Sequence, residues 1–127
     1  MRLAQPVLVT VKRQGREVPA VAQVTKMGYT FVLHRLTGEP LFPVEERPVP
    51  KSAVPGEETW PTQPVPLKPP PFARQSVSRD DISGVTPESR KECLEILDGA
   101  DVDVRIYDPF GERDAIIMPG LNGGANW

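Results

Sequence analysis

The stretch PAVAQVTKMGYTFVLHRLTGEPLF, residues 19–42, decides how this chain folds. Its apolar residues 20–24 predict one strand, and residues 29–33, rich in aromatic and β-branched side chains, predict another. Lys26-Met27-Gly28 between them is a tight corner, because glycine adopts a positive φ without strain. A second turn follows, and then a third apolar run begins at Leu41-Phe42. The pattern predicts a meander that needs neighbours, since so small a sheet cannot bury both of its faces.

The residues on either side extend this meander and then interrupt it. Residues 6–11 predict a further strand, so residues 6–42 are expected to form a four-stranded antiparallel sheet, which is the content of one propeller blade. Eleven of the sixteen prolines fall between residues 40 and 71. Because each proline fixes φ and removes a donor, we expect residues 43–77 to form a surface excursion without helix or regular strand. Its expected anchors are Trp60, Leu67 and Phe72.

A helical insert is predicted over residues 78–99. Ser78 can cap a short helical turn, and Thr86 followed by Pro87 is a typical start for the longer helix. Cys93 falls on the apolar face of that helix, where we expect a small buried side chain. Residues 100–127 return to β character, with strands expected over 102–107 and 115–118 from their apolar alternation. They would be the start of the next blade.

Bulk properties exclude several classes of function. The chain has 127 residues, enough for one domain at most, and a net charge of −2, which leaves no basic surface for nucleic acid. Its one cysteine cannot form an internal disulfide. No apolar run approaches the roughly 20 residues that span a bilayer, and residues 1–6 contain no secretory apolar region.

Residues 32–42 carry a resemblance to a known family. They are similar to the blade-closing motif of quinoprotein propellers, usually Ala-x-Asp-x-x-Thr-Gly-x-x-x-Trp, with Val32, His34 and Phe42 at the Ala, Asp and Trp positions. With residues 23–28 and 55–64 included, the chain resembles pyrroloquinoline quinone (PQQ) dehydrogenases of the membrane-bound glucose dehydrogenase type, from about Gln5 onward. The resemblance implies a mainly β fold: a single partial segment, residues 1–127, of an eight-bladed β-propeller, with one four-stranded blade and part of the next.

The same resemblance implies roles for individual residues. The lysine of the Thr-Lys-x-Gly corner, Lys26 here, would bind the orthoquinone oxygens of PQQ and stabilise the charge that develops on them. Asn126 and Trp127 would line the same cofactor pocket. From the residues alone, Lys26 is more simply a solvated hairpin lysine, and Asn126 and Trp127 could equally be a turn amide and a core indole. We expect His34 to hold a turn and not to catalyse.

The resemblance also implies that this chain is incomplete as a catalyst. The family's catalytic aspartate and its Ca²⁺ ligands correspond to positions upstream of Met1, so we expect a truncated segment of a PQQ-dependent sugar or alcohol dehydrogenase that is inactive alone. PQQ and Ca²⁺ would belong to the complete parent and would not be bound by this chain by itself. The location would be periplasmic in an exported parent, and cytoplasmic for a stand-alone product.

Two other functions remain open from the sequence. Residues 64–71 contain a Pro-x-x-Pro spacing with Lys68 inside it, which is the pattern of a proline-rich protein-interaction module. The unpaired blade edges could instead pair with one another, because an open strand offers free backbone groups. The expected partners are therefore the remaining propeller blades or other copies of the chain.

Overall fold

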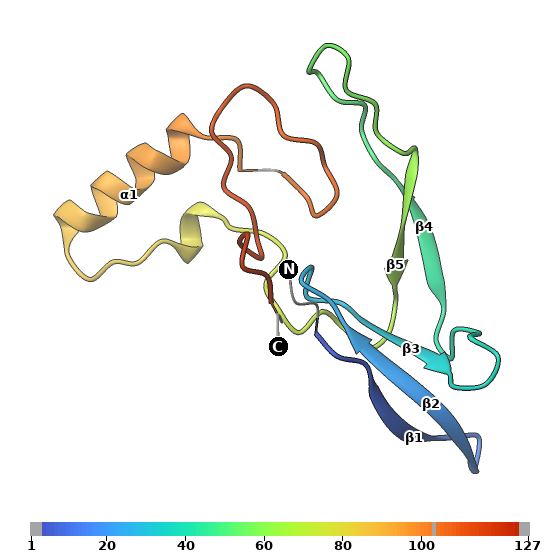
Figure 1. Ribbon diagram of the computed structural model, residues 1–127. Coiled ribbons are helices and arrows are strands. Elements are labelled where there is room, and N and C mark those ends of the chain that lie inside the picture. Colours follow the sequence, from blue (N-terminus) through green and yellow to red (C-terminus); the bar gives the residue numbers. More distant parts are fainter. Residues whose placement is uncertain (1–3, 103, 125–127) are drawn as a thin grey trace.

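The computed structural model describes residues 4–102 and 104–124, in which strands and one α-helix follow an open, angular path (Figure 1). The strands form two separate antiparallel sheets. α1 (Pro87–Gly99) lies at the opposite end of the molecule from β1 (Val7–Arg13). The fold is mainly β with one short helix, as the sequence predicted. Across the described ranges, no helix has the length and apolar character that a membrane crossing requires.

The first sheet contains β1, β2 (Arg16–Val24) and β3 (Thr30–His34) in that order. β1 and β2 are joined by a two-residue turn at Gln14 and Gly15, whose φ angles of 50° and 76° are both positive. Such a turn has the twist that joins two antiparallel strands without splaying them. The strands and the polar hairpin predicted before residue 25 are therefore confirmed.

The predicted fourth strand of this sheet is wrong. After β3 the chain makes a single antiparallel bridge, between Leu33 and Pro40, and the Leu41 N–H donates to the Val32 carbonyl at 2.8 Å. Pro43 falls at the next hydrogen-bonded position after Leu41 and has no N–H to donate, so a longer ladder would lack a bond there. The pairing consequently stops after one bridge, although Leu41 is buried.

The proline-rich region does contain regular strands, which corrects the prediction for residues 43–77. β4 (Val44–Pro48) and β5 (Thr62–Pro66) pair antiparallel from Val44 with Pro66 to Pro48 with Thr62. The flanking bonds, Leu67 N–H to the Pro43 carbonyl and Val49 N–H to the Pro61 carbonyl, are both 2.9 Å.

The positions of the prolines explain how this ladder forms. The flanking bonds show that the pairs formed by odd-numbered residues, such as Glu45 with Val65, are the hydrogen-bonded pairs of this ladder. Pro48, Pro64 and Pro66 have even numbers and therefore lie in the non-hydrogen-bonded pairs. At those positions an N–H would point away from the partner strand, so its loss costs no bond in a two-stranded sheet. Spacing along the strand, and not proline content, decides whether a strand can form here.

The three expected anchors of the proline-rich region are exposed. Trp60 has 73% of its surface accessible, and Leu67 and Phe72 also lie on the surface. Val65 and Pro66, inside β5, are the buried residues instead.

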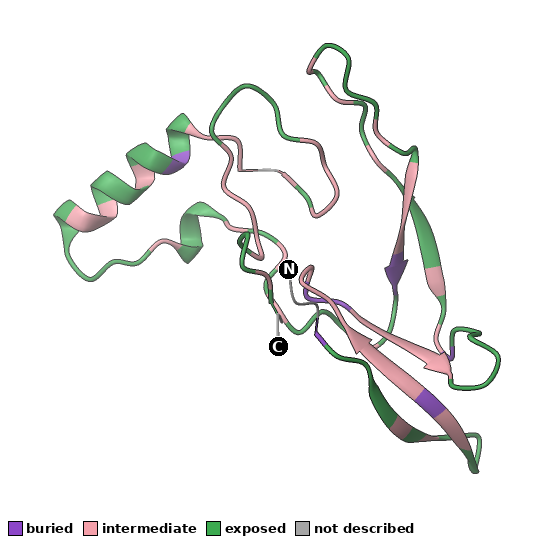
Figure 2. Cartoon of the chain, in the orientation of Figure 1, coloured by how far each residue is buried: buried purple, intermediate pink, exposed green. Residues whose placement is uncertain are grey.

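The helical insert begins and ends where the sequence predicted. In the short 3₁₀ turn Arg79–Asp81, Asp81 Oδ2 accepts from the Ser78 N–H at 2.8 Å. Thr86 Oγ1 caps α1 by accepting from the Ser89 N–H at 3.1 Å. The prediction for Cys93 was wrong, because this side chain is exposed on a helix that lies outermost in the molecule (Figures 1 and 2). Of the helix, only Leu97 is buried.

The strands expected after residue 100 are not formed in the described part of that segment. A single parallel bridge joins Asp101 to Ala115. Between them Asp108 makes a local turn, in which its Oδ2 accepts from the Arg105 N–H at 3.1 Å and its N–H donates to the Arg105 carbonyl at 3.0 Å. Local side-chain bonds of this kind compete with a strand ladder for the backbone groups.

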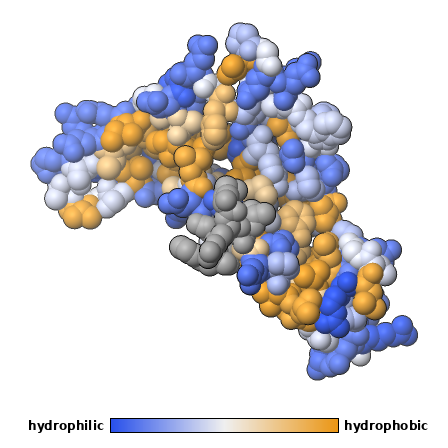
Figure 3. Space-filling model, in the orientation of Figure 1, coloured by the Kyte–Doolittle hydropathy of each residue, from blue (hydrophilic) through white to orange (hydrophobic). Residues whose placement is uncertain are grey.

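Buried residues are few and lie far apart. The buried apolar residues are Ala4, Ala20, Tyr29, Leu41, Val65 and Leu97, and they appear as separate patches along the chain (Figure 2). Apolar side chains reach the surface over the first sheet and over the segment that follows α1 (Figure 3). On β1, Val7 and Leu8 are 57% and 65% exposed. Large exposed apolar residues indicate contact surfaces when they gather together.

His34 holds the turn that follows β3, as predicted. Its Nδ1 accepts from the Thr37 N–H at 3.2 Å and from the Leu36 N–H at 3.4 Å. Its main chain closes the same turn, because the Gly38 N–H donates to the His34 carbonyl at 2.8 Å. The imidazole Nδ1 accepts the hydrogen bonds that a carboxylate oxygen of the motif's aspartate would accept at this position.

Variants of His34 whose side chain can accept a hydrogen bond should therefore be more stable than variants whose side chain cannot. We expect His34→Leu to lower the free energy of unfolding by about 1 kcal/mol, the usual value of a lost hydrogen bond, while His34→Asp retains it. Chemical denaturation of the purified chain measures both. Leu36→Ala, at a position 80% exposed, is the near-neutral control. Equal stability of the Leu and Asp variants would contradict the role.

Candidate functional site

The candidate site is built on the corner between β2 and β3, residues 25–29, which contains Lys26. Thr25 closes the corner twice, because its N–H and its Oγ1 donate to the Tyr29 carbonyl at 2.9 and 3.0 Å. The Gly28 N–H donates back to the Thr25 carbonyl at 3.1 Å, and Gly28 has φ of 80°. A residue with a side chain adopts that φ only with strain, so the predicted need for glycine is confirmed.

Two segments from later in the chain hold this corner from outside. Each of three consecutive carbonyls accepts one hydrogen bond: Lys26 from the Gly124 N–H at 2.8 Å, Met27 from the Gln75 side-chain amide at 2.8 Å, and Gly28 from the Phe72 N–H at 2.9 Å. Buried or half-buried carbonyls need such donors, and a turn leaves them unpaired otherwise. The corner thereby has a fixed position relative to residues 72–75 and to the loop around Gly123.

The same two segments pack against the corner without space for additional atoms. A Cβ added at Gly28 would lie 2.8 Å from the Ala73 Cβ, and one added at Gly123 would lie 2.7 Å from the Lys26 Cβ. Gly123 also has a positive φ, 81°. Lys26 is therefore half-buried, and it lies next to Gly28 in the chain and in contact with Gly123 from the later loop.

The Lys26 ammonium is a cation without an ion-pair partner among residues 4–102 and 104–124. Asn126 and Trp127, predicted to line the same pocket, lie outside the described residues. The loop that leads toward them in the sequence does reach the corner, since Gly124 is bonded to Lys26. The chemistry available at the corner is that of a positively charged hydrogen-bond donor on a main chain that is fixed, beside glycine residues.

A small cavity of about 200 Å³ lies next to the corner, lined by the aromatic rings of Tyr29 and Tyr107 together with Arg47, Val65 and Gln75. The Tyr107 hydroxyl donates to the Pro64 carbonyl at 3.3 Å. Burial raises the pKa of Tyr29, with the Arg47 charge opposing it. Burial also raises the pKa of Tyr107, with added contributions from Tyr29 and Glu46. The cavity therefore favours neutral phenols.

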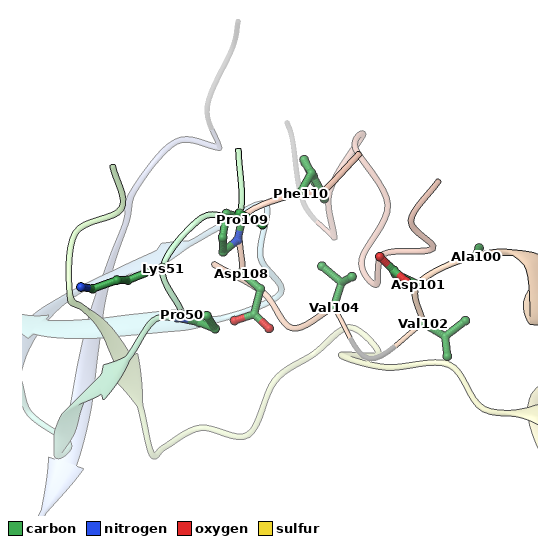
Figure 4. Close-up of a pocket in the computed structure, with 11 residues that line it drawn as sticks. Pro50, Lys51, Ala100, Asp101, Val102, Val104, Asp108, Pro109 and Phe110 are labelled. Atoms are coloured by element: carbon green, nitrogen blue, oxygen red, sulfur yellow. The ribbon is translucent and has the colours of Figure 1, made fainter. Parts of the chain in front are cut away.

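A larger cavity of about 470 Å³ opens between the loop at Pro50 and the segment after α1 (Figure 4). Its carboxylates already have partners: Asp108 pairs with Arg105 at 3.2 Å, and Asp101 with Arg113 at 3.1 Å. The Lys51 side chain extends away from the other labelled residues (Figure 4). This cavity presents no group of side chains that converge on a ligand.

No group of three or more His, Cys, Asp or Glu side chains within the described ranges is placed to share a metal ion. The sequence predicted Lys26 as a site residue and Phe72 as an anchor, but it gave no sign of Gln75, of the bond from the Phe72 N–H, or of the cavity lined by Tyr29 and Tyr107 (the tyrosine cavity). A glutamine in a proline-rich stretch has no pattern that indicates a long-range bond, so nothing in the sequence could have found it.

Comparison with known proteins defines the class. The family model that describes the β-propeller domain of glucose/ethanol/alcohol dehydrogenases that use PQQ matches residues 3–127. The chain belongs to this family of PQQ-dependent dehydrogenases. No solved structure gives a significant match.

Curated relatives agree with the family match. The chain is 49% identical over 131 residues to a quinoprotein glucose dehydrogenase of Gluconobacter oxydans (strain 621H). This alignment covers 98% of the chain and 15% of the relative. A glycerol dehydrogenase large subunit of Gluconobacter thailandicus is 38% identical over 114 residues, 89% of the chain and 15% of the relative. A quinate/shikimate dehydrogenase (quinone) of Acinetobacter baylyi is 35% identical over 124 residues, again 15% of its length. The chain thus spans about 15% of the length of these relatives.

The close packing at Gly28 predicts a large cost for adding one methyl group. Gly28→Ala should combine the strain of a positive φ, about 1–2 kcal/mol, with overpacking of about 1–3 kcal/mol against Ala73. Gly38→Ala is the matched control, because Gly38 has φ of 77° but nothing within 4 Å of the added Cβ. Denaturant unfolding should show the Gly28 variant to be clearly less stable than the Gly38 variant. Equal losses would mean that the corner is not held as described.

The two tyrosines, which are all that the chain contains, should titrate together at high pH. A folded-state pKa above the ordinary value of about 10 stabilises the fold below that value, and the stabilisation is lost as pH rises through the folded pKa. Phenolate absorbance should therefore rise at higher pH in the folded chain than in the chain unfolded by denaturant. Tyr107→Phe should leave one raised titration, that of Tyr29. Coincident curves for folded and unfolded chain would contradict the burial of both rings.

Proposed function

We propose that this chain is a propeller segment of a PQQ-dependent sugar or alcohol dehydrogenase, to which it contributes Lys26 as a wall of the cofactor pocket. One observation supports this most: the carbonyls of Lys26, Met27 and Gly28 each accept a hydrogen bond from a later segment. The main chain from which the Lys26 side chain projects therefore has a defined position. A cation intended to bind one ligand atom benefits from such preorganisation, because no reorganisation is needed at the moment of reaction.

The residues at the corner fit an anionic quinone. An ammonium with a half-buried stem can donate to a quinone or carboxylate oxygen, and the close approach of Gly123 to the base of that stem restricts where it starts. When bound, PQQ supplies the electron-accepting centre for alcohol oxidation. Lys26 would hold the quinone oxygen and stabilise negative charge there. Asn126 and Trp127 are proposed to complete the same wall.

We further propose that the first sheet is one blade of an eight-bladed propeller, and that the segment after α1 leads into the next blade. The exposed Val7 and Leu8 and the free edge of β1 support this, since an edge strand with apolar side chains needs a neighbour. The remaining blades would be that neighbour in the complete enzyme, and other copies could replace them in the isolated chain. Such pairing gives the scattered buried residues the shared core that the segment lacks alone.

The isolated 127-residue chain is proposed to be catalytically silent. It spans about 15% of the relatives, so most of the groups that surround a cofactor in a complete enzyme would come from elsewhere. A proton acceptor for the alcohol and the Ca²⁺ ligands are proposed to lie in that remainder.

A segment exchange tests the proposal. The matched segment of the Gluconobacter oxydans glucose dehydrogenase is replaced by this chain, and dye reduction with glucose is measured after addition of PQQ and Ca²⁺. Lys26→Ala should lower kcat by about 100- to 1000-fold, the usual effect of removing one donor to a developing anion. Lys51→Ala, at an exposed lysine, should leave kcat unchanged. Cofactor binding to each hybrid is followed separately by absorbance.

Two results would contradict the proposal. The first is full activity of the Lys26→Ala hybrid, which would remove the lysine from the cofactor site. The second is dye reduction by the purified 127-residue chain with PQQ and Ca²⁺, which would show that the segment is a complete catalyst.

A further inference from the structure

Gln75 supplies the one side-chain bond among the three that hold the Lys26 corner. Its Nε2 donates to the Met27 carbonyl at 2.8 Å and to the Ala73 carbonyl at 3.2 Å. Both partners are main-chain acceptors, so the amide can be placed only with its nitrogen toward them. The bond to Met27 connects the middle of the corner to a residue 48 positions later in the sequence.

The side chain is fixed in this position by its surroundings. Gln75 Nε2 would lie 2.8 Å from a Cβ at Gly28, so the amide lies directly against the bare main chain of the corner. On its other side Gln75 lines the tyrosine cavity. Its Oε1 is buried and has no hydrogen-bond partner among the described residues. An unpaired buried oxygen costs free energy, which the two bonds from Nε2 offset, whereas an apolar side chain of the same length would leave the Met27 carbonyl unpaired. What the amide adds is the bond to Met27.

That bond acts on the direction of the Lys26 side chain. The Gly124 bond fixes the peptide plane that follows Lys26, and the Gln75 bond fixes the plane that follows Met27. These two planes meet at the Cα of Met27, so fixing both holds Met27 and, through the plane that it shares with Lys26, restricts the direction of the Lys26 Cα–Cβ bond. The bonds from Gly124 and Phe72 come from main-chain N–H groups and not from side chains. The Gln75 bond is the one that a side chain controls.

We propose that Gln75 is a positioning residue, which orients the Lys26 ammonium toward the quinone through the Met27 carbonyl. This rests on the proposed function of Lys26 and extends it to a residue that does not touch the cofactor. A small displacement of a group that must meet a developing charge lowers the rate strongly, because the alignment of the reacting atoms is lost. Loss of the Gln75 bond therefore affects catalysis and leaves the fold in place.

A double-mutant cycle in the hybrid enzyme separates positioning from a general structural role. Gln75→Met keeps the length of the side chain and removes the donor. It should lower kcat by about 10-fold while the KM for glucose stays within about twofold. In the Lys26→Ala background the same change should lower kcat by less than about twofold, because its effect is exerted through Lys26. An equal loss in both backgrounds would overturn the proposal.

Gln23→Met is the matched control. Like Gln75, Gln23 donates from Nε2 to two main-chain carbonyls, those of Ala4 at 2.9 Å and Val24 at 2.7 Å, but it has no bond to residues 26–28. It should lower the stability of the chain about as much as Gln75→Met does. Its effect on kcat should stay within about twofold. A loss of kcat as large as that of Gln75→Met would show that any lost glutamine bond suffices, and would overturn the proposal.

A second readout uses the 127-residue chain and no cofactor. Lysine amines are labelled by reductive ¹³C-methylation, and the Lys26 signal is assigned by its absence in Lys26→Arg. Gln75→Met should shift the Lys26 methyl signal, whereas Gln23→Met should leave it in place. An unchanged Lys26 signal in Gln75→Met would overturn the positioning role even if Lys26 itself proves essential. If Lys26→Ala has no effect in the hybrid, the proposed function fails, and this signal still decides whether Gln75 orients the amine.

Discussion

The structure depends on the hydrogen bonds that three consecutive main-chain carbonyls, those of residues 26–28, accept at the corner between β2 and β3. Residues 26–28 turn too tightly to bond with one another, and their carbonyls point outward where only residues from later in the chain can reach them. An unpaired half-buried carbonyl is costly, so the chain brings two later segments to the corner. Because the donors come from residues 72–75 and from Gly124, this corner ties together parts of the sequence that no strand ladder connects.

This arrangement explains why so open a chain has a defined site. Its two sheets share no strand, and its buried residues are scattered (Figure 2). The position of the corner comes from hydrogen bonds and glycine contacts, which need little buried area. Apolar side chains on the first sheet and on the segment after α1 remain exposed (Figure 3). In the family to which the chain belongs, a segment of this kind would hold a lysine in place while its neighbours supply the core.

The sequence predicted features that depend on nearby residues. The β1–β2 hairpin, the capped helix from Pro87 and the turn held by His34 follow from local pattern, and the structure confirms them. Prediction from the sequence failed where the spacing of residues along a strand, or contacts between distant residues, determine the structure. The strand β5 forms because its prolines fall at alternate positions, which a count of prolines cannot show. The strand expected after Val102 gives way to a turn in which Asp108 takes the backbone bonds.

The candidate site was predictable only in part, for the same reason. Lys26 could be identified because its motif is local. Gln75 meets Met27 only after the intervening residues have folded, so no local pattern indicates that contact. The prediction for Cys93 is wrong because an apolar helix face is buried only where another element covers it, and α1 lies at the outside of the molecule (Figure 1).

The central claim is that later segments bond directly to the carbonyls of the corner, and scalar couplings through hydrogen bonds measure this. In the ¹³C,¹⁵N-labelled chain we predict a coupling from the Gly124 nitrogen to the Lys26 carbonyl carbon, and another from the Phe72 nitrogen to that of Gly28. Couplings within β2–β3 serve as the internal reference. Observation of the reference couplings without these two would contradict the account.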